Sequence, residues 1–382
     1  MKLYTRIIAL VLVMITALTL IACHEKGEIV MTVDGVEITS GLYLGFQLEA
    51  HNNFLNGVNE ELKAQNATTG PEKYADYFNY SYQGKDAVTF IKEETLRLVK
   101  EYVYVEKKFD SYGLTLDKSD IDSINNNAKS SWENEKETYE LNGVGYETFK
   151  LLATHDYKKN ILFYYLYDKA DESMPGSGSL AVSDEEVGAK VSEEYILAQT
   201  VALDVEVTED ATATDVKVQE AKTKLEDYLK KYNDGTSTFE EIYKALKEKD
   251  LSENVDDSAS EEKTIYPKTA YLYTEQTEDT AVAAMYGMLK TKVAEEGFEY
   301  GKAYIIGGKD DAQVALVVVY DITKDPYYMA LSRNYYLPDL RGDEFETNIT
   351  NEAAKLQYVA NEKLLKYYDP KNIDLDSVNS EE

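Results

Sequence analysis

The sequence holds few of the residues on which many protein sites depend. It has one cysteine and three histidines among 382 residues. A single cysteine excludes an internal disulfide, so the fold must be stabilised by its hydrophobic core. His24, His51 and His155 do not cluster in the sequence, and we expect each of them at the surface or at the edge of a core. We therefore expect no metal site and no cofactor.

The sequence motifs of common enzymes are also missing. The chain contains no Gly-x-Ser-x-Gly, His-Glu-x-x-His, glycine-rich phosphate loop or Cys-x-x-Cys. Asp117, Asp120 and Asp122 are closely spaced, but the glycine and the final glutamate of a calcium-binding loop are lacking. Helix capping explains these aspartates better. Hydrolase and nucleotide chemistry are unsupported, and the sequence assigns no catalytic residue.

Basic residues are scarce relative to acidic ones. Lysine and arginine number 40 against 71 aspartates and glutamates, so the net charge is −31. This charge repels nucleic acid and anionic lipid head groups, which excludes a nucleic-acid partner and membrane adhesion by a basic patch. With 43% hydrophobic residues the chain can form two or three packed domains. The 33 tyrosines suit adaptable binding surfaces, or they reflect the composition of the source organism's proteins.

The first residues indicate a lipid anchor. Lys2 and Arg6 precede an uncharged apolar run over residues 7–22, shorter than the roughly 20 residues of a membrane-spanning helix. The run ends in a segment that resembles the bacterial lipobox: Leu20, Ile21, Ala22 and Cys23. We predict that residues 1–22 are a signal peptide and residues 23–28 a tether, with lipid on Cys23 holding the protein to the outer face of the cell membrane. An ordinary secretory signal that happens to contain a cysteine is the alternative.

The next part of the chain, residues 29–172, is predicted to be mainly helical. Residues 29–39 alternate like a strand pair around a turn at Asp34 and Gly35. From residue 40 the apolar spacing becomes helical, and a further aromatic helix is predicted from about residue 146 to 169. The strongest periodicity is a single apolar stripe that must pack against other helices: Val88, Ile91, Thr95, Leu98, Tyr102, Val105 and Phe109.

A short, uncharged segment rich in glycine and serine, residues 174–179, marks a predicted domain boundary. Beyond it, Ser183 with Glu186 and Thr238 with Glu241 fit capping boxes at helix starts. Apolar strands over residues 195–207 and 314–320 alternate with helices. The second run is continuous, which is typical of a strand inside a sheet with both faces covered. Residues 180–325 are therefore predicted to form a small α/β domain.

The helical pattern returns in residues 326–382. Phe345, Ile349, Ala353 and Leu356 share one face, and we expect this face to pack back on the N-terminal helices. The predicted fold class is therefore α+β. Its mainly helical core is built from both ends of the chain, with the small α/β domain inserted between them.

The order of these pieces resembles the PrsA-type foldase lipoproteins and the SurA-like periplasmic chaperones. The resemblance is carried by residues 33–39 before a helix, the long helix ending near residues 112–113, residues 182–187 ahead of 195–198, and the C-terminal helices. Each motif alone is degenerate, and their order over nearly the whole mature chain carries the likeness. In that family a helical chaperone core surrounds a parvulin prolyl-isomerase domain, and the resemblance implies the same division here.

The sequence departs from the parvulin pattern where the catalytic histidines stand. A parvulin domain has a His-Ile-Leu-Val-like strand near its start and a Gly-Tyr-His-Ile-like strand near its end. Here Tyr195 takes the first position, and residues 314–320 contain no histidine. The expected Gly-Gly-Asp-Leu-Gly-like loop is replaced by the acidic residues 251–263 and by Tyr266 and Pro267. The resemblance therefore implies a degenerate parvulin-like domain that has lost its isomerase centre.

Taken together, these features predict a membrane-anchored chaperone without isomerase catalysis. We expect it to bind unfolded secreted polypeptides in an aromatic, acid-rimmed groove between its helical and α/β parts, while homodimer formation stays open. An active peptidylprolyl isomerase is one alternative. A solute-binding lipoprotein of a transporter is another, but it would have two doubly wound α/β lobes, and the long helical stripes argue against it.

The lipobox interpretation makes a direct prediction. Replacing the acceptor, Cys23→Ser, should remove the lipid site and leave an uncleaved or released protein, because the anchor depends on that thiol. Processing and detergent partitioning of the expressed variant measure this. A variant that is processed and partitions as the parent does would contradict the interpretation.

Overall fold

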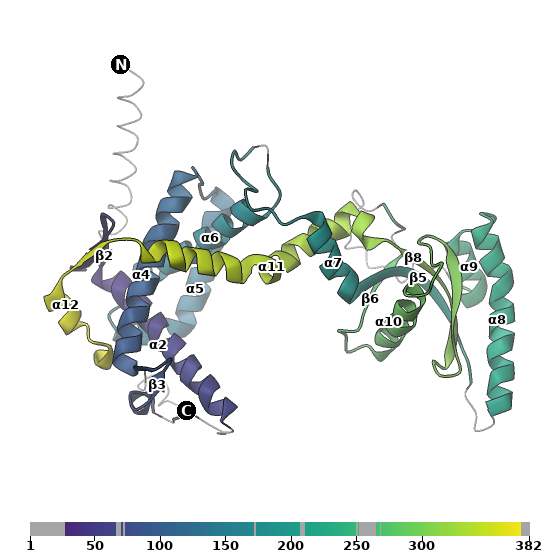
Figure 1. Ribbon diagram of the computed structural model, residues 1–382, viewed down its shortest axis with the longest axis horizontal. Helices are drawn as coiled ribbons and strands as arrows, with labels where there is room; N and C mark the ends of the chain where they lie inside the picture. The colour runs from purple at the N-terminus through teal and green to yellow at the C-terminus, as the bar shows by residue number, and fades with distance from the viewer. Residues whose placement is uncertain are drawn as a thin grey trace, which may run out of the picture. The chain divides into compact units, whose positions relative to one another are not determined.

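The chain divides into two compact units, which we describe separately. The computed structural model describes residues 27–65, 70–71, 73–171, 173–206, 211–249, 251, 265–267 and 269–375 (Figure 1). The first unit contains the chain up to Ser179 together with the residues from Gly342 onward. The second unit runs from Leu180 to Arg341. In the described part of the chain, no helix is both long enough and apolar enough to span a bilayer.

Four long helices form the body of the first unit: α2 (Ser40–Ala64), α4 (Ala87–Ser111), α5 (Lys118–Leu141) and α6 (Tyr146–Tyr167). The short elements α3 (Tyr74–Tyr77), β3 (Ser81–Tyr82) and β4 (Lys85–Asp86) connect α2 to α4. Asp86 caps α4. Asp117 and Asp120 form a capping box on α5, which confirms the capping role predicted for Asp117 and Asp120. The predicted stripe on α4 is buried from Ile91 to Phe109.

A small antiparallel sheet joins the two ends of the chain within the first unit. Its strands are β1 (Ile29–Val33), β2 (Val36–Thr39) and β9 (Tyr358–Ala360), in the order β2-β1-β9. The predicted turn is present, with Asp34 at φ 46° and Gly35 at φ 86°, the positive angles that a two-residue hairpin requires. The inner face of β1 and β2 packs into the main core of this unit.

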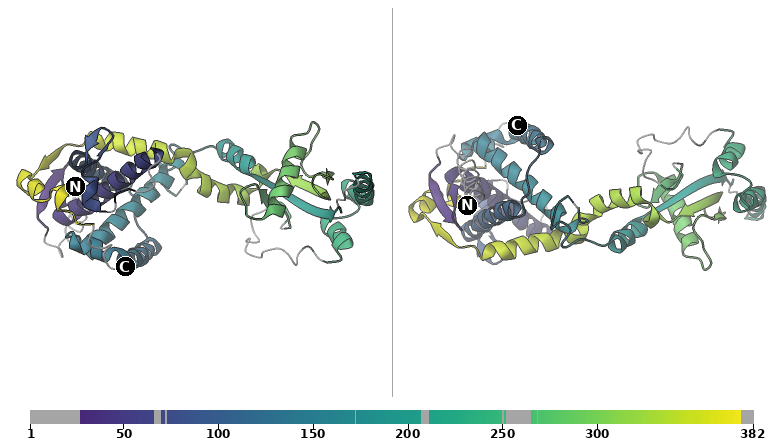
Figure 2. Two further views of the ribbon diagram at one scale, coloured as in Figure 1. Left: turned by 90° about the horizontal axis from the view of Figure 1, so that it is seen from below. Right: turned by 90° about the horizontal axis from the view of Figure 1, so that it is seen from above.

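The C-terminal segment packs back on the N-terminal helices. It comprises α11 (Pro326–Ala354), β9, α12 (Glu362–Tyr367) and the short helix η3 (Pro370–Asn372). Phe345 lies 5.3 Å from Phe163 and 6.1 Å from Tyr167 between ring centroids, and Ile349 is buried. Figure 2 shows the late half of α11 running beside the helices of this unit.

The second boundary between the units differs from the expected one at residue 326. The first part of α11, up to Arg341, belongs to the second unit. There Tyr336 donates a hydrogen bond to the Glu194 carboxylate at 2.6 Å, and Arg333 donates to the Val182 carbonyl at 2.7 Å. The helix α11 therefore contributes its first part to the second unit and its last part to the first unit. The periodicity of the sequence did not locate this boundary within the helix.

The second unit is built around a four-stranded sheet in the order β6-β5-β8-β7. The strands are β5 (Tyr195–Asp204), β6 (Tyr271–Thr274), β7 (Ala303–Gly308) and β8 (Gln313–Tyr320). Every pairing among the described strands of this unit is antiparallel, so these strands form an α+β arrangement and not the parallel sheet of an α/β domain. Residues 314–320 are all buried between two neighbouring strands, which confirms the prediction for this run.

Helices cover both faces of this sheet. They are α7 (Asp184–Glu194), α8 (Ala211–Asn233), α9 (Phe239–Lys247) and α10 (Thr280–Val293), and the short helix η2 (Ile322–Lys324) follows β8. On one face Met285 and Leu289 of α10 pack against Ile196 and Val317. On the other face α8 and α9 contribute Leu225, Phe239 and Ile242, all fully buried. Both predicted capping boxes are present, at the starts of α7 and α9.

The return of α11 should control the stability of the first unit. Phe345→Ala should lower the free energy of unfolding of this unit by about 3 to 5 kcal/mol, because it leaves a cavity against Phe163 and Tyr167. Trp132 is the single tryptophan and lies in α5, so its fluorescence during denaturant unfolding reports on this unit alone. Thr347→Ala, at an exposed position of the same helix, is the matched control and should change stability by less than about 0.5 kcal/mol. Equal stability of the two variants would contradict the assigned packing.

Candidate functional site

Several residues singled out by the sequence lie outside the described part of the chain. These are Leu20, Ile21, Ala22, Cys23 and His24, together with most of the acidic stretch 251–263. Tyr195 is described: it is half-buried, begins β5 and pairs with Thr274 of β6. The lipid site therefore stays a prediction, while the position of Tyr195 at the start of a sheet strand is an observation.

The expectation that the histidines lie at the surface or at a core edge is wrong for His51 and His155. Their exposed fractions are 0% and 6%. His51 packs against the rings of Tyr74 and Phe78, with centroids 5.4 and 6.2 Å away, and among the described residues neither of its ring nitrogens has a hydrogen-bond partner. Burial lowers the pKa of His51 to about 3, so the ring is neutral at ordinary pH.

His155 belongs to a buried charged group that joins α4 to α6. Its Nδ1 lies 3.5 Å from Glu106 Oε1, and Lys158 Nζ lies 2.5 Å from Glu106 Oε2. Burial by itself would raise the pKa of Glu106. The hydrogen bond from His155 and the charge of Lys158 outweigh burial and lower this pKa. The carboxylate thus stays charged and paired, so the group serves structure and offers no free base.

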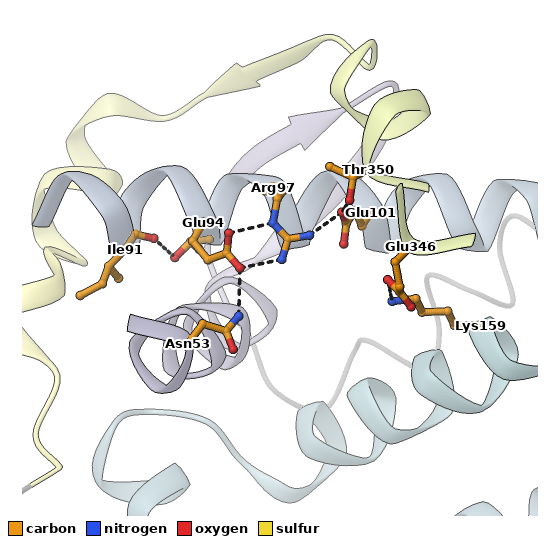
Figure 3. Close-up of polar contacts among 9 residues, drawn as sticks. Asn53, Ile91, Glu94, Arg97, Glu101, Lys159, Glu346 and Thr350 are labelled. Atoms are coloured by element: carbon orange, nitrogen blue, oxygen red, sulfur yellow. Dashed lines mark hydrogen bonds and ion pairs between the residues drawn. The ribbon is translucent and has the colours of Figure 1, made fainter. Parts of the chain in front are cut away.

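A second charged network, centred on Arg97 of α4, joins three helices (Figure 3). Arg97 donates to both oxygens of Glu94, at 2.7 and 2.6 Å, and to Glu101 at 2.5 Å. Asn53 of α2 donates to Glu94 at 2.9 Å, and the Thr350 hydroxyl of α11 donates to Glu101. Every charge here has a partner, and the network cross-links α2, α4 and α11.

A different set of residues on the first unit combines exposed acids with aromatic rings. We call it the acidic–aromatic surface and define it by Glu49 of α2, Trp132 and Tyr139 of α5, and Phe149 and Asp156 of α6. The Phe149 ring lies 5.3 Å from Trp132 and 4.9 Å from Tyr139. Trp132 and Tyr139 are half-buried, and both carboxylates are exposed. Tyr139 also packs beside Leu44 and Leu48, which attaches the surface to α2.

Electrostatics show that these acids act on one another and on the tyrosine. Desolvation raises the pKa of Tyr139 to about 12, and the charges of Glu135, Glu49 and Asp156 add to the rise. Desolvation by surrounding side chains, reinforced by Asp156, raises the pKa of Glu49 to about 7, although Glu49 keeps access to solvent. Carboxylates crowded in this way are stabilised by an added cation, because it relieves their mutual repulsion.

This arrangement can bind a positively charged side chain next to an apolar one. Carboxylates attract lysine or arginine, and aromatic faces hold either cations or apolar groups. Among the described residues no cluster of histidine, cysteine, aspartate and glutamate could hold a metal ion. The surface therefore has the chemistry of a peptide-binding site. The sequence contained a signal for this cluster of aromatic rings. Trp132 and Tyr139 are seven residues apart, which places them on one face of a helix, and Phe149 follows on the next helix.

The second unit contains a buried polar network that sequence reasoning missed. The Tyr320 hydroxyl donates to Gln199 Oε1 at 2.7 Å, and Gln199 Nε2 donates to Thr269 at 2.5 Å. The Thr269 hydroxyl in turn donates to Glu240 at 3.0 Å. Burial, and then a hydrogen bond with Tyr232, raise the pKa of Tyr320. Tyr320 thus stays protonated and its hydroxyl is engaged, so this hydroxyl is neither a nucleophile nor a base, and the network ends at the exposed carboxylate of Glu240.

Comparisons with known proteins leave the family open. No protein-family model matches the sequence, and no curated protein matches it. Among solved structures, the chain is similar to the foldase protein PrsA from Lactococcus lactis, at 10% identity over 91% of this chain and 100% of that one, with a TM-score of 0.29. It is also similar to a chain from the study of PEB4 and Cj1289, described as SurA-like chaperones of Campylobacter jejuni. That match has 11% identity over 87% of this chain and 99% of the other, with a TM-score of 0.25. At these TM-scores neither likeness bears on function, which has to be inferred from the residues of this chain.

His51 should make the first unit sensitive to acid. Its pKa is about 3 in the folded chain against 6.5 as the ordinary value, so the unfolded chain binds the proton first. The stabilisation that depends on a neutral His51 is complete above pH 6.5 and is lost progressively as the pH falls toward 3. At pH 5 the loss should be about 2 kcal/mol.

The measurement is denaturant unfolding of parent and His51→Phe at several pH values, followed by Trp132 fluorescence. Glu49 acts in the opposite direction, because its raised pKa adds stability as the pH falls from 7 toward 4.5. The difference between parent and variant cancels that contribution. If the two proteins show the same pH dependence below pH 6.5, the assigned burial of His51 is wrong.

Proposed function

We propose that this protein is an extracytoplasmic chaperone that holds unfolded secreted polypeptides, anchored to the outer face of the membrane by lipid on Cys23. The observation that carries the proposal is the acidic–aromatic surface of the first unit. It offers exposed carboxylates beside half-buried rings, and the nearby charges of Lys159 and Arg97 do not offset the burial that raises the pKa of Glu49. Such a surface suits a chain segment that carries both lysine or arginine and apolar residues.

The charge of the whole protein favours the same kind of partner. A net charge of −31 attracts positively charged chains at long range and repels acidic ones. Polypeptides that have just crossed a membrane are unfolded and expose apolar segments, which aggregate when they meet. Flat aromatic rings accept many apolar side chains without a fixed shape, so a surface of this composition can bind clients of different sequence.

The acidic–aromatic surface is supported by a fixed turn between α5 and α6. Asn142 donates to the Asp374 carbonyl at 2.8 Å, and the Asp374 amide donates back to Asn142 at 2.8 Å. Val144, which follows this turn, is fully buried. The C-terminal segment thus holds the turn that positions Tyr139 and Phe149. A surface held in advance loses less entropy when it binds a flexible chain.

We infer that the second unit contributes no prolyl-isomerase catalysis. Residues 180–341 contain no histidine, Tyr195 occupies the position where the parvulin pattern has one, and the side chains of Gln199 and Tyr320 are engaged in hydrogen bonds. A proline peptide bond has a rotation barrier of about 20 kcal/mol, and lowering it requires groups aimed at that bond. These observations support holding of clients without isomerisation.

The proposed anchor would keep the holding surface close to the membrane. The first sheet strand begins at Ile29, so the chain between it and Cys23 can extend at most about 20 Å. A chaperone tethered this closely would meet clients as they emerge. Binding would be reversible, because exposed ion pairs and cation–π contacts each contribute only about 1 kcal/mol or less.

The holding activity can be tested with the full mature protein and an aggregating basic client followed by light scattering. We expect the parent to suppress aggregation, and salt to weaken the suppression because exposed charges are screened. The double substitution Glu49→Gln with Asp156→Asn should weaken suppression several-fold, and so should Trp132→Ala.

A matched control separates the local site from overall charge. Glu220→Gln with Glu226→Gln removes two exposed acids of α8, giving the same net charge as the first double variant. We expect this control to act as the parent does. Equal losses in both double variants, or no suppression by the parent, would count against the proposal. Acceleration of proline isomerisation in test peptides by any of these proteins would favour the isomerase alternative.

A further inference from the structure

The outer edge of β9 carries main-chain groups that no described strand uses. The register pairs Val33 with Tyr358, Thr32 with Val359 and Met31 with Ala360. Flanking bonds run from the Asp34 amide to the Gln357 carbonyl and from the Asn361 amide to the Val30 carbonyl, each 2.8 Å. In an antiparallel pair the residues alternate in direction, so positions 357, 359 and 361 face β1. The N–H and C=O groups of Tyr358 and Ala360 therefore face away from the sheet.

This edge is open and apolar. Val359 is 76% exposed and Tyr358 is 45% exposed. In the described residues the sheet ends at β9, with no further strand paired to it. Natural proteins usually protect an edge strand with a charge, a proline or a bulge, because unpaired strand groups recruit other chains. The strand Tyr358–Ala360 carries no charge, proline or bulge, and its protection is limited to its short length of three residues. Its edge is therefore available for pairing with a short extended segment.

We propose that the outer edge of β9 binds an extended segment of the client by strand addition. This inference rests on the proposed function and names how the client's main chain is recognised. Tyr358 and Ala360 each offer one donor and one acceptor, which any extended polypeptide can pair irrespective of its sequence. Val359 lies on the same sheet face as Glu37, since both pair with Thr32. That face therefore fits a strand carrying apolar and basic side chains.

A second copy of this chain is the other conceivable occupant, and charge disfavours it. Each copy carries a net charge of −31, so two copies repel one another. A pairing between two strands of only three residues offers little to offset that repulsion. A cationic, unfolded segment gains from the same charge, which is why we assign the edge to the client.

The test uses the full mature protein and a synthetic peptide of alternating valine and lysine, with the Kd measured by calorimetry. Ala360→Pro removes an outward N–H and leaves the bonds to β1 intact, since prolines are tolerated at an edge on the solvent side. We expect it to weaken peptide binding about tenfold or more, because the loss of a donor also disturbs its neighbour, with the melting temperature little changed. Val359→Pro, which removes a donor to β1, should instead lower the melting temperature.

A second probe leaves the protein unaltered. The same peptide N-methylated at every residue keeps its charge and side chains but has no N–H left on either edge to donate to β9, so we expect it to bind the parent about tenfold more weakly. Equal binding of both peptides by the parent would overturn the inference. Concentration-dependent dimerisation of the parent that Ala360→Pro abolishes would assign the edge to a second copy and overturn it as well.

The two proposals fail in different ways. If the parent suppresses client aggregation but Ala360→Pro binds the peptide equally well, the β9 inference is wrong and the holding function stands. If the parent neither suppresses aggregation nor binds the peptide, both are wrong. Weakened peptide binding in Ala360→Pro, together with a normal melting temperature, supports strand addition at this edge.

Discussion

The packing of the last half of α11 on α4 and α6 is the contact on which the first unit depends. Phe345 fills the space beside Phe163 and Tyr167, and Thr350 reaches Glu101 next to Arg97. Without the residues beyond 341, the N-terminal helices lack part of their core, because the side chains that pack on their apolar faces come from the other end of the chain. The segment from Leu180 to Arg341 is thereby made an insertion with a core of its own. The pairing of β1 with β9 also joins the two ends of the chain, through main-chain hydrogen bonds.

Partly buried ion pairs help to determine which helices pack beside α4. Arg97 pairs with Glu94 and Glu101 of its own helix, whereas Glu106 of α4 pairs with Lys158 and His155 of α6, so the Glu106 charge is satisfied only when α6 lies beside α4. Because these side chains keep some contact with water, removing one member should cost less than the roughly 3 to 5 kcal/mol of a fully buried pair. These networks connect α2 and α6, the helices that carry Glu49 and Asp156, to α4. The exposed acids of the surface can then remain unpaired, because stability is supplied elsewhere.

Local patterns in the sequence predicted much of the fold, but they did not predict contacts between residues that are far apart in the chain. Apolar spacing located the α4 stripe and the Phe345 face, and side-chain capping located the starts of α5, α7 and α9. The burial of His51 was missed because its ring packs against Tyr74 and Phe78, which enter from a segment with no clear periodicity. β9 is too short to alternate visibly, and the Gln199–Tyr320 bond joins residues 121 positions apart. Contacts between such distant residues cannot be predicted from the pattern of neighbouring residues.

The two proposed binding features of the first unit complement each other chemically. The acidic–aromatic surface would select clients by charge and apolar content, whereas the β9 edge would accept any extended backbone. Each contact alone is weak, since a few exposed ion pairs and four main-chain groups contribute little beyond the entropy of ordering a flexible chain. When one client engages both, the second contact forms within a single molecule and at a raised effective concentration. A holder must retain an unfolded chain briefly and then release it. Two weak contacts joined through the client meet that requirement better than one strong site, because releasing either contact restores the low affinity of the other.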